Sequence, residues 1–301
     1  MHKKLRQQLI TGWFLFASIN AYTQAEQLTI ATWNLQWLDN QSTRQEARRT
    51  PADYSALNSI ITSVNADFIA FQEVADLNSA ASVFDPNLYN IELSSRSIIG
   101  NVDTDWRQYV GFAIKKKIDY RRHPDLFALD VTANNNLRYG VDVTLLIPEQ
   151  PSVRVLIVHL KSGCHSKKTI RGVSCKRLSQ QASVINQWVA EREEEQSHFI
   201  VLGDFNRHLI NENDWFWRRI NNTMVKTGIG HVSQCRSAHI KEKSKRWYVK
   251  QYKTHIDHIL ISQSLVKQMD NDSFKQRLFS SSDLEQYRLS DHCPISIKLT
   301  F

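Results

Sequence analysis

Residues 199–206, with the sequence FIVLGDFN, constrain the fold more than any other stretch of this chain. The nearly continuous apolar run at 199–202 is typical of a short strand that is buried on both faces. Gly203 ends the run and allows the backbone to approach a neighbouring segment closely. Asp204 and Asn206 are two residues apart, so both side chains leave the same face of the chain. Such a pair either binds a cation or orients a water molecule, or it caps a turn at the end of a strand.

The first 25 residues are typical of a secretory signal peptide. Lys3, Lys4 and Arg6 form a basic start, residues 9–21 are mostly apolar, and the small residues at 23–25 suit cleavage before Glu26. The apolar run is shorter than the roughly 20 residues that a membrane span requires, and an uncleaved anchor is the alternative. The formal charge is +8 for the whole chain and, without these three cations, +5 for residues 26–301. We therefore predict a secreted or periplasmic protein with no stable membrane association after cleavage.

Four cysteines, an even number, suggest disulfides in an exported protein. Three pairings are possible, and a bridge between Cys164 and Cys175 would close a short loop and leave Cys235 to pair with Cys293. Zinc binding is the rival, because His159 and His165 are close in the sequence. The absence of any Cys-x-x-Cys spacing favours disulfides.

The hydrophobic pattern predicts strands interrupted by helices without strict alternation. Strands are expected near 27–37, 66–74, 109–114, 138–147, 153–160, 199–204, 255–262 and 294–301, and helices near 54–64 and 177–195. The 301 residues, 42% of them hydrophobic, suffice for one large domain or two small ones. This order of elements favours a layered α/β fold with mixed sheets.

Polar side chains recur at or near the ends of the apolar runs. They are Asn34, Glu73, His159, Asp204, Asn206, Asp257, Asp291 and His292. In a layered α/β protein, strand ends at one edge of a sheet form a common rim. Buried carboxylates are costly unless they are paired or bind a metal, so their convergence predicts a cation site.

Six short motifs occur in an order that resembles the endonuclease/exonuclease/phosphatase superfamily, in particular its deoxyribonuclease I-like, secreted bacterial nuclease branch. They are TWNLQW (32–37), FQEV (71–74), HLKS (159–162), LGDFN (202–206), IDHIL (256–260) and LSDHCP (289–294). The resemblance extends from about residue 27 to residue 301 and implies one catalytic domain at 26–301. It implies an α/β four-layer sandwich, in which helices flank two packed mixed β-sheets. It also implies hydrolysis of phosphate esters with Mg²⁺, or with Mn²⁺ or Ca²⁺ in its place.

The resemblance assigns roles position by position. Glu73, Asn34 and Asp291 resemble the metal ligands. Asp204 resembles the residue that positions or deprotonates the attacking water, and Asn206 the residue that orients it. His292 would contact the scissile phosphate while Asp257 fixes its orientation, an arrangement that also suits histidine as a group that titrates near neutral pH.

Two positions depart from the pattern of deoxyribonuclease I-like enzymes. His159 matches a second histidine that acts as general acid, but Tyr109 stands where a glutamate would orient it. Arg138 lies where a phosphate-contacting arginine is often found, although Tyr139 and Gly140 follow it in place of the more usual proline. An ordinary surface charge is the alternative reading of Arg138.

Two basic regions indicate a polyanionic substrate. Between 161 and 177 there is no acidic residue, and we expect this segment to lie over the site. Its predicted substrate-binding residues are Lys161, Lys167, Lys168 and Arg171. Residues 236–253 carry seven Lys or Arg against Glu242 alone, interleaved with Trp247, Tyr248 and Tyr252. Cations mixed with aromatic rings are typical of nucleic-acid binding, and two solvated faces are the alternative.

The combined pattern predicts a monomeric, metal-dependent nuclease, and in particular an endonuclease acting on DNA. A sphingomyelinase-type phospholipid phosphodiesterase is the second hypothesis, although no clear apolar hairpin for docking on a bilayer stands out in the sequence. A binding module without catalytic activity is the third, and the near-complete set of catalytic residue types argues against it. The sequence leaves DNA against RNA, single against double strands and endonuclease against exonuclease open.

Overall fold

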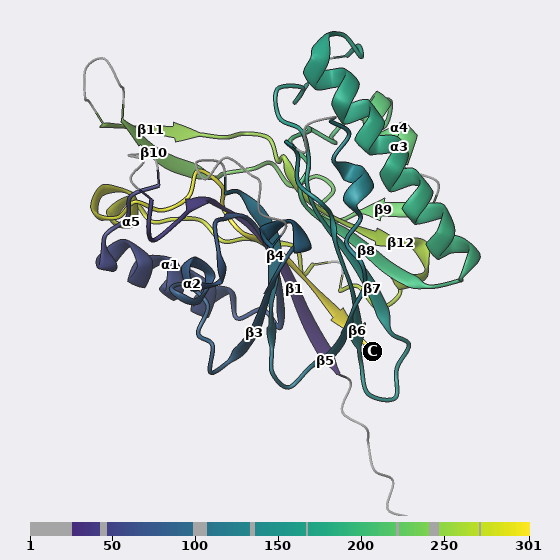
Figure 1. Cartoon of the computed structure of the whole chain (residues 1–301), viewed down its shortest axis with the longest axis horizontal. Coiled ribbons are helices and arrows are strands. Elements are labelled where there is room, and N and C mark those ends of the chain that lie inside the picture. Colours follow the sequence, from purple (N-terminus) through teal and green to yellow (C-terminus); the bar gives the residue numbers. More distant parts are fainter. Residues whose placement is uncertain are drawn as a thin grey trace, which may run out of the picture.

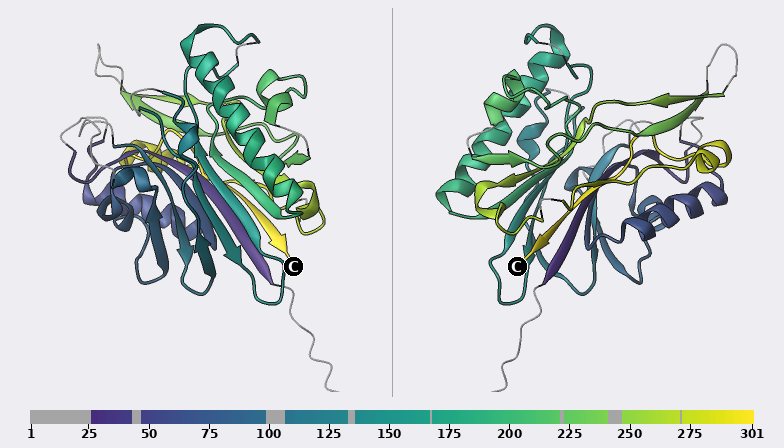
Figure 2. Two further views of the ribbon diagram at one scale, coloured as in Figure 1. Left: turned by 45° about the vertical axis from the view of Figure 1, so that its right-hand side comes forward. Right: turned by 180° about the vertical axis from the view of Figure 1, so that it is seen from behind.

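A computed structural model describes residues 26–42, 47–98, 107–132, 136–166, 168–220, 223–240, 247–270 and 272–301. The predicted signal peptide at 1–25 and the predicted substrate contact Lys167 lie outside these residues. Two six-stranded sheets pack face to face, with helices on both outer faces (Figures 1 and 2). The predicted α/β four-layer sandwich is therefore confirmed.

The first sheet is mixed, because β1 is parallel to β2 and antiparallel to β14. Its strands, in spatial order, are β13 (Lys275–Gln276), β14 (Ile295–Thr300), β1 (Gln27–Leu38), β2 (Phe68–Val74), β4 (Tyr109–Lys115) and β3 (Tyr89–Leu93).

The second sheet is also mixed, because β8 is parallel to β7 and antiparallel to β12. Its strands are β5 (Asp119–Arg122), β6 (Val141–Leu146), β7 (Val153–His159), β8 (His198–Asp204), β12 (Asp257–Ser262) and β9 (Met224–Lys226). Strands β10 (Arg236–Ile240) and β11 (Trp247–Gln251) form a separate two-stranded hairpin.

Three apolar layers hold the sandwich together. The inner one lies between the sheets and includes Ile30, Phe112 and Val155. The helices cover the outer faces: α1 (Pro51–Val64), α2 (Leu77–Ala81) and α5 (Ser281–Gln286) pack on the first sheet, and α3 (Gly172–Glu194) and α4 (Trp215–Ile220) on the second. Short 3₁₀ helices complete the chain at η1 (Ser95–Ser97), η2 (Phe127–Leu129) and η3 (Gln263–Leu265). Among the described residues, no helix has the length and apolarity that a membrane crossing requires.

Both favoured cysteine pairs are disulfide-bonded. Cys164 is joined to Cys175, and Cys235 is joined to Cys293. No cysteine is therefore left to bind zinc. The first bridge fixes the segment that follows β7 to the first turn of α3, and the second ties the start of the β10–β11 hairpin to the segment before β14.

Candidate active site

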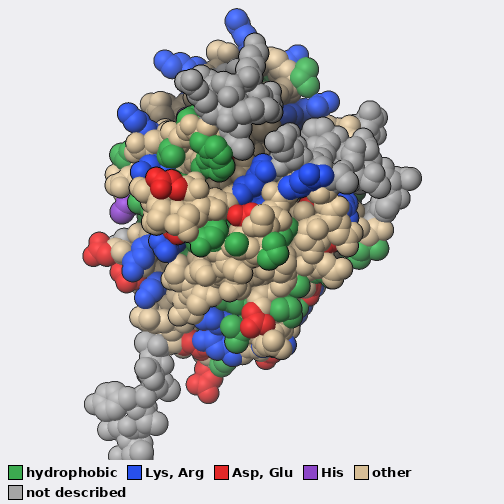
Figure 3. Space-filling view, turned by 90° about the vertical axis from the view of Figure 1, so that its left-hand side faces the viewer, with side chains coloured by type: hydrophobic (Ala, Val, Ile, Leu, Met, Phe, Trp, Pro, Cys, Tyr) green, Lys and Arg blue, Asp and Glu red, His purple; other side chains and the backbone are tan. Residues whose placement is uncertain are grey.

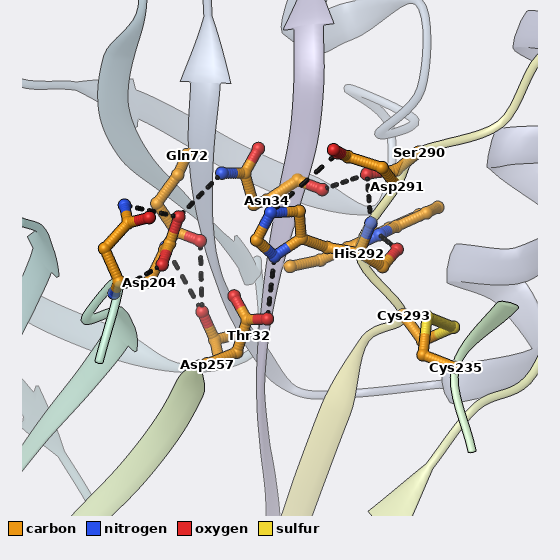
Figure 4. Close-up of polar contacts among 12 residues, drawn as sticks. Thr32, Asn34, Gln72, Asp204, Cys235, Asp257, Ser290, Asp291, His292 and Cys293 are labelled. Atoms are coloured by element: carbon orange, nitrogen blue, oxygen red, sulfur yellow. Dashed lines mark hydrogen bonds and ion pairs between the residues drawn. A yellow bond between two sulfur atoms is a disulfide. The ribbon is translucent and has the colours of Figure 1, made fainter. Parts of the chain in front are cut away.

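Strand register brings three of the predicted side chains together. Asp204 ends β8 and is directly opposite His159 at the end of β7 and Asp257 at the start of β12. The site therefore lies at the strand ends of the second sheet, where the polypeptide leaves the core. The last part of β1 approaches from the other sheet, and Asn34 Nδ2 donates a hydrogen bond to Asp204 Oδ2 over 3.1 Å (Figure 4).

Gly203 allows this close approach of strands. Its φ is +137°, and a Cβ at this position would lie 2.0 Å from the carbonyl oxygen of Val158 in β7. Any side chain would therefore push β7 and β8 apart directly beside His159 and Asp204. The glycine that ends the apolar run has the role that the sequence suggested.

We predict that Gly203→Ala destabilises the fold by about 3 kcal/mol or more and lowers catalytic turnover, because backbone strain and a steric clash combine. Gly230→Ala is the matched control, since Gly230 also has a positive φ, +85°, but no atom lies within 4 Å of its Cβ position. Its expected loss is about 1 kcal/mol. Urea unfolding of both variants measures the difference, and equal losses would show that close strand contact is not what Gly203 provides.

Asp204 is buried and receives a converging set of hydrogen bonds. The backbone N–H of Asn206 donates to Oδ1 over 2.7 Å, and the Asn206 side chain donates to Oδ2 over 3.1 Å. Burial raises the pKa of Asp204 to about 7, and the nearby Asp257 adds to this rise while His292 and the hydrogen bonds oppose it. A carboxylate with this pKa can take up a proton near neutral pH.

Glu73 forms the other acidic centre of the site. Its Oε1 accepts a hydrogen bond from Asn34 Nδ2 at 3.2 Å, and its Oε2 accepts from the backbone N–H of Trp37 at 3.1 Å. Burial raises the pKa of Glu73, the charge of Asp291 raises it further, and Arg138 opposes the shift. Glu73 has a φ of +61°, so its backbone is held in a conformation that non-glycine residues rarely adopt.

The donor set fits a hard divalent cation. The buried Asp204 and the partly buried Glu73 both have raised pKa values, which indicates negative charge that the protein itself does not neutralise. Asp204 and Asp257 also offer carboxylate oxygens that, together with a ring nitrogen of His292, lie within 4.8 Å of one another. Carboxylate and amide oxygens are the ligands that Mg²⁺ and Ca²⁺ prefer. A cation here would relieve the cost of burying these charges.

His292 is held by a carboxylate. Its Nδ1 lies 2.7 Å from Asp257 Oδ2, and its Nε2 lies 3.8 Å from Asp291 Oδ1 (Figure 4). Burial by itself lowers the pKa of His292, but the charges of Asp257, Asp291 and Asp204 outweigh it and raise the pKa well above 6.5. His292 is therefore protonated at neutral pH.

The pKa of His159 is shifted in the opposite direction to that of His292. Burial lowers its pKa well below 6.5, and the cations Arg138, His292 and Lys161 lower it further. Its Nε2 lies 3.4 Å from Asp204 Oδ2, while its Nδ1 is buried and has no hydrogen-bond partner among the described residues. Tyr109, expected to replace the orienting glutamate, is buried in the wall of the same cleft without bonding this nitrogen. His159 is thus a neutral imidazole in this structure.

The cleft above these residues has a volume of about 1390 Å³. Of the predicted substrate contacts, Arg138 and Lys161 line it, and Arg138 Nη2 also donates to Gln108 Oε1. Lys168 and Arg171 are exposed and lie outside its lining. The basic segment therefore reaches the cleft through Lys161 at its start and Arg177 at its end.

Two supporting residues escaped the sequence analysis. Ser290 Oγ donates to the backbone carbonyl of Asn34 over 2.6 Å and accepts from the His292 N–H over 3.0 Å. The partly buried guanidinium of Arg49 donates to backbone carbonyls of two separate segments, including those of Gln36 and Leu289. Ser290 was within a recognised motif and could have been found, whereas Arg49 lies in a polar stretch with no distinguishing pattern.

Comparison with known proteins gives one family and a set of similar folds. Residues 31–292 match the sequence profile of the Endonuclease/Exonuclease/phosphatase family. No curated protein matches the sequence. The structure of TDP2 from C. elegans is similar with a TM-score of 0.62 and 18% identity, over 91% of this chain and 75% of that chain.

Two further structures share the fold. The 3'-5' exonuclease NExo from Neisseria meningitidis gives a TM-score of 0.59 at 14% identity, over 91% of this chain and 100% of that one. D. rerio TDP2 complexed with single strand DNA product gives 0.58 at 17% identity, over 90% and 98%. Because the family profile spans most of the sequence, this chain belongs to the endonuclease/exonuclease/phosphatase family of phosphate-ester hydrolases.

Proposed function

We propose that this protein is an exported, divalent-metal-dependent endonuclease that hydrolyses phosphodiester bonds in DNA. The observation that carries the proposal is the Asp204 carboxyl, buried at the floor of a large polar cleft with a pKa of about 7 and the protonated His292 close by. Phosphodiester hydrolysis needs a group that accepts a proton from water and a positive charge for the phosphorane oxygens. Asp204 and His292 meet these two needs.

Asp204 accepts the proton of the attacking water, and Asn206 holds the carboxylate through two hydrogen bonds. His292, positively charged and fixed by Asp257, stabilises charge on the phosphate and can protonate the leaving oxygen. The high pKa of His292 and the low pKa of His159 favour His292 as this proton donor. The neutral His159 then serves to position Asp204 or the phosphate.

Glu73, Asn34 and Asp291 would hold the metal. A bound Mg²⁺, Mn²⁺ or Ca²⁺ supplies Lewis-acid polarisation of the phosphate and neutralises its charge. Arg138 lines the cleft and its charge lowers the pKa of Glu73, so its guanidinium suits contact with a phosphate oxygen bound near that carboxylate.

DNA is favoured by charge and by fold. Along the top of the face seen in Figure 3, the charged side chains are Lys and Arg. Similar folds in D. rerio TDP2 and in the 3' phosphatase NExo from Neisseria have been determined with a single-strand DNA product and a product DNA hairpin. The two disulfides and the sequence of residues 1–25 support export to an oxidising compartment, where we propose that the protein acts as a monomer.

We expect the purified protein to nick supercoiled plasmid, to stop when EDTA is added and to recover with excess Mg²⁺. Because cationic side chains displace counterions from DNA, raising the salt from about 50 to 200 mM should lower activity roughly 10- to 1,000-fold. Sphingomyelin vesicles incubated in parallel provide the competing substrate. Phosphocholine release without plasmid nicking would replace the nuclease with a phospholipid phosphodiesterase, and a flat salt profile would count against a nucleic-acid substrate.

A further inference from the structure

The β10–β11 hairpin stands apart from both sheets of the sandwich. Five residue pairs, from Arg236↔Gln251 to Ile240↔Trp247, join its strands to each other, and neither strand belongs to a six-stranded sheet. Figures 1 and 2 show it running over the side of the molecule that carries α1 and α5, and Arg236 Nη2 donates to Ser281 Oγ at the start of α5. Nothing in the catalytic scheme explains why a two-stranded arm lies there.

The base of this arm is fixed beside the catalytic histidine. Cys235, immediately before β10, is bonded to Cys293, which directly follows His292 (Figure 4). At the other end of the arm, the Tyr252 N–H donates to the carbonyl of Cys235 over 2.8 Å. The disulfide and this hydrogen bond hold the arm against the site.

One face of the arm carries a connected row of rings and a cation, which we call the ring strip: His239, Tyr248, Lys250 and Tyr252. The strip follows from strand alternation, because residues 248, 250 and 252 point to the same side and His239 is paired with Tyr248. The His239 and Tyr248 rings stack with centroids 5.4 Å apart. Lys250 Nζ lies 4.5 Å from the centroid of the Tyr252 ring, whose hydroxyl is 3.1 Å from His239 Nε2.

The ring strip begins inside the active-site cleft and ends in solvent. Lys250 and Tyr252 line the same cleft as Asp291 and His292. Tyr248, farther out, is 45% exposed and presents free ring surface. The described part of 235–256 contains Arg236, Lys250 and Lys253 and no acidic residue. A polymer whose phosphate occupies the site would therefore meet cations and aromatic faces as it leaves the cleft on this side.

We propose that the ring strip binds the single-stranded segment of a nucleic acid that extends from the scissile phosphate, with bases stacked on Tyr248 and phosphates near Lys250. Aromatic stacking accepts every base, and lysine supplies sequence-independent charge. The assignment rests on the proposed nuclease function. The assignment adds to that function a preference for substrates with an unpaired strand next to the cleavage site.

The opposite face of the arm supplies a matched control. Trp247 adjoins Tyr248 in sequence, is 54% exposed, and points away from the strip because successive strand residues alternate. Tyr248→Leu removes the stacking ring while keeping an apolar side chain, and Trp247→Leu makes the equivalent change on the other side. Neither substitution alters charge, so any difference between them reports on which face the DNA uses.

The test is fluorescence anisotropy of a labelled single-stranded oligonucleotide of about 20 bases, long enough to cover the strip, in EDTA to prevent cleavage. We expect Tyr248→Leu to raise the Kd about 5- to 100-fold, because this range corresponds to the loss of stacking on one base. Trp247→Leu should change the Kd less than about twofold. The effect of Tyr248→Leu should be smaller on duplex of the same sequence. Equal effects of the two variants, no effect of Tyr248→Leu, or equal losses on single strand and duplex would overturn the proposal.

Two parallel measurements separate this inference from the proposed function. Cleavage by the wild-type protein, tested with Mg²⁺ on the same oligonucleotide and on a small aryl phosphodiester, decides whether the protein is a phosphodiesterase at all. Binding of the oligonucleotide in EDTA tests whether the ring strip contacts DNA, independently of catalysis. If Trp247→Leu abolishes binding to sphingomyelin vesicles while neither variant changes the Kd for DNA, the arm docks on lipid and the nucleic-acid assignment is wrong.

Discussion

Asp204→Asn will lower the turnover of a phosphodiester substrate by about 10³- to 10⁴-fold, because the variant cannot accept a proton from water. The same change will stabilise the metal-free protein. Asparagine is close in shape to the protonated carboxyl and carries no charge that must be buried. Loss of activity together with a gain in stability distinguishes a catalytic carboxylate from a structural one.

The gain in stability of Asp204→Asn over the wild type should depend on pH in a defined direction. Burial raises the pKa of Asp204 from its ordinary 3.8 to about 7, so the folded protein holds a proton that the unfolded chain releases. The contribution of Asp204 to the stability of the wild-type protein therefore falls as the pH rises from about 4 to 7, and the variant lacks this contribution. At pH 8 the difference in free energy of unfolding should be on the order of 2–4 kcal/mol, reduced by the two amide donors that face Oδ2.

Urea unfolding in EDTA at pH 5 and pH 8 measures this difference. Asp119→Asn is the matched control, because Asp119 is exposed on β5 and lies outside the cleft. A variant of Asp204 that is less stable than the wild type at pH 8 would show that its ionised carboxylate supports the fold.

Asp257→Asn will lower turnover by about 10²- to 10³-fold, and His292→Gln by about 10³-fold or more. The Asp257 carboxylate is the nearest partner of His292 and the largest influence that keeps it protonated against burial. Without it, the pKa of His292 falls, so the alkaline limb of the pH–rate profile should move to lower pH. Since both residues act through one imidazole, the double variant should be no worse than His292→Gln alone.

Steady-state kinetics across pH 5–9 on the single and double variants test this coupling. His198→Gln, at the opposite end of β8 from Asp204, is the matched control. Additive losses in the double variant, or an alkaline limb that does not move in Asp257→Asn, would mean that the two side chains act separately.

The sequence predicted the layers and the main strands because their apolar runs are long and buried. The polar residues at strand ends came together because β7, β8 and β12 are in register at His159, Asp204 and Asp257. That register is set by long-range pairing, which no local pattern encodes. The sequence shows where the strands end, but it does not show how far apart those strand ends lie in space.

Other features could not be predicted from the sequence, and each case has a physical reason. Helix α3 begins at Gly172, five residues before the expected start, because Cys175 is buried through its disulfide and no side-chain cap marks Arg171. The hairpin β10–β11 is held by Cys235–Cys293 and by ring contacts, so its strands lack the apolar alternation of a core strand. The opposite protonation of His159 and His292 depends on which carboxylates surround each ring in space.

Cleavage of supercoiled plasmid by wild-type protein and by Asp204→Ala, with Mg²⁺ and with EDTA, tests the central claim most directly. Asp119→Ala, the same substitution at an exposed site, controls for handling and folding. We predict nicking by the wild type and by Asp119→Ala with Mg²⁺ alone, and none above background by Asp204→Ala. Metal-dependent nicking that survives Asp204→Ala would contradict the site, and no nicking by the wild type under any divalent cation would contradict the proposed nuclease.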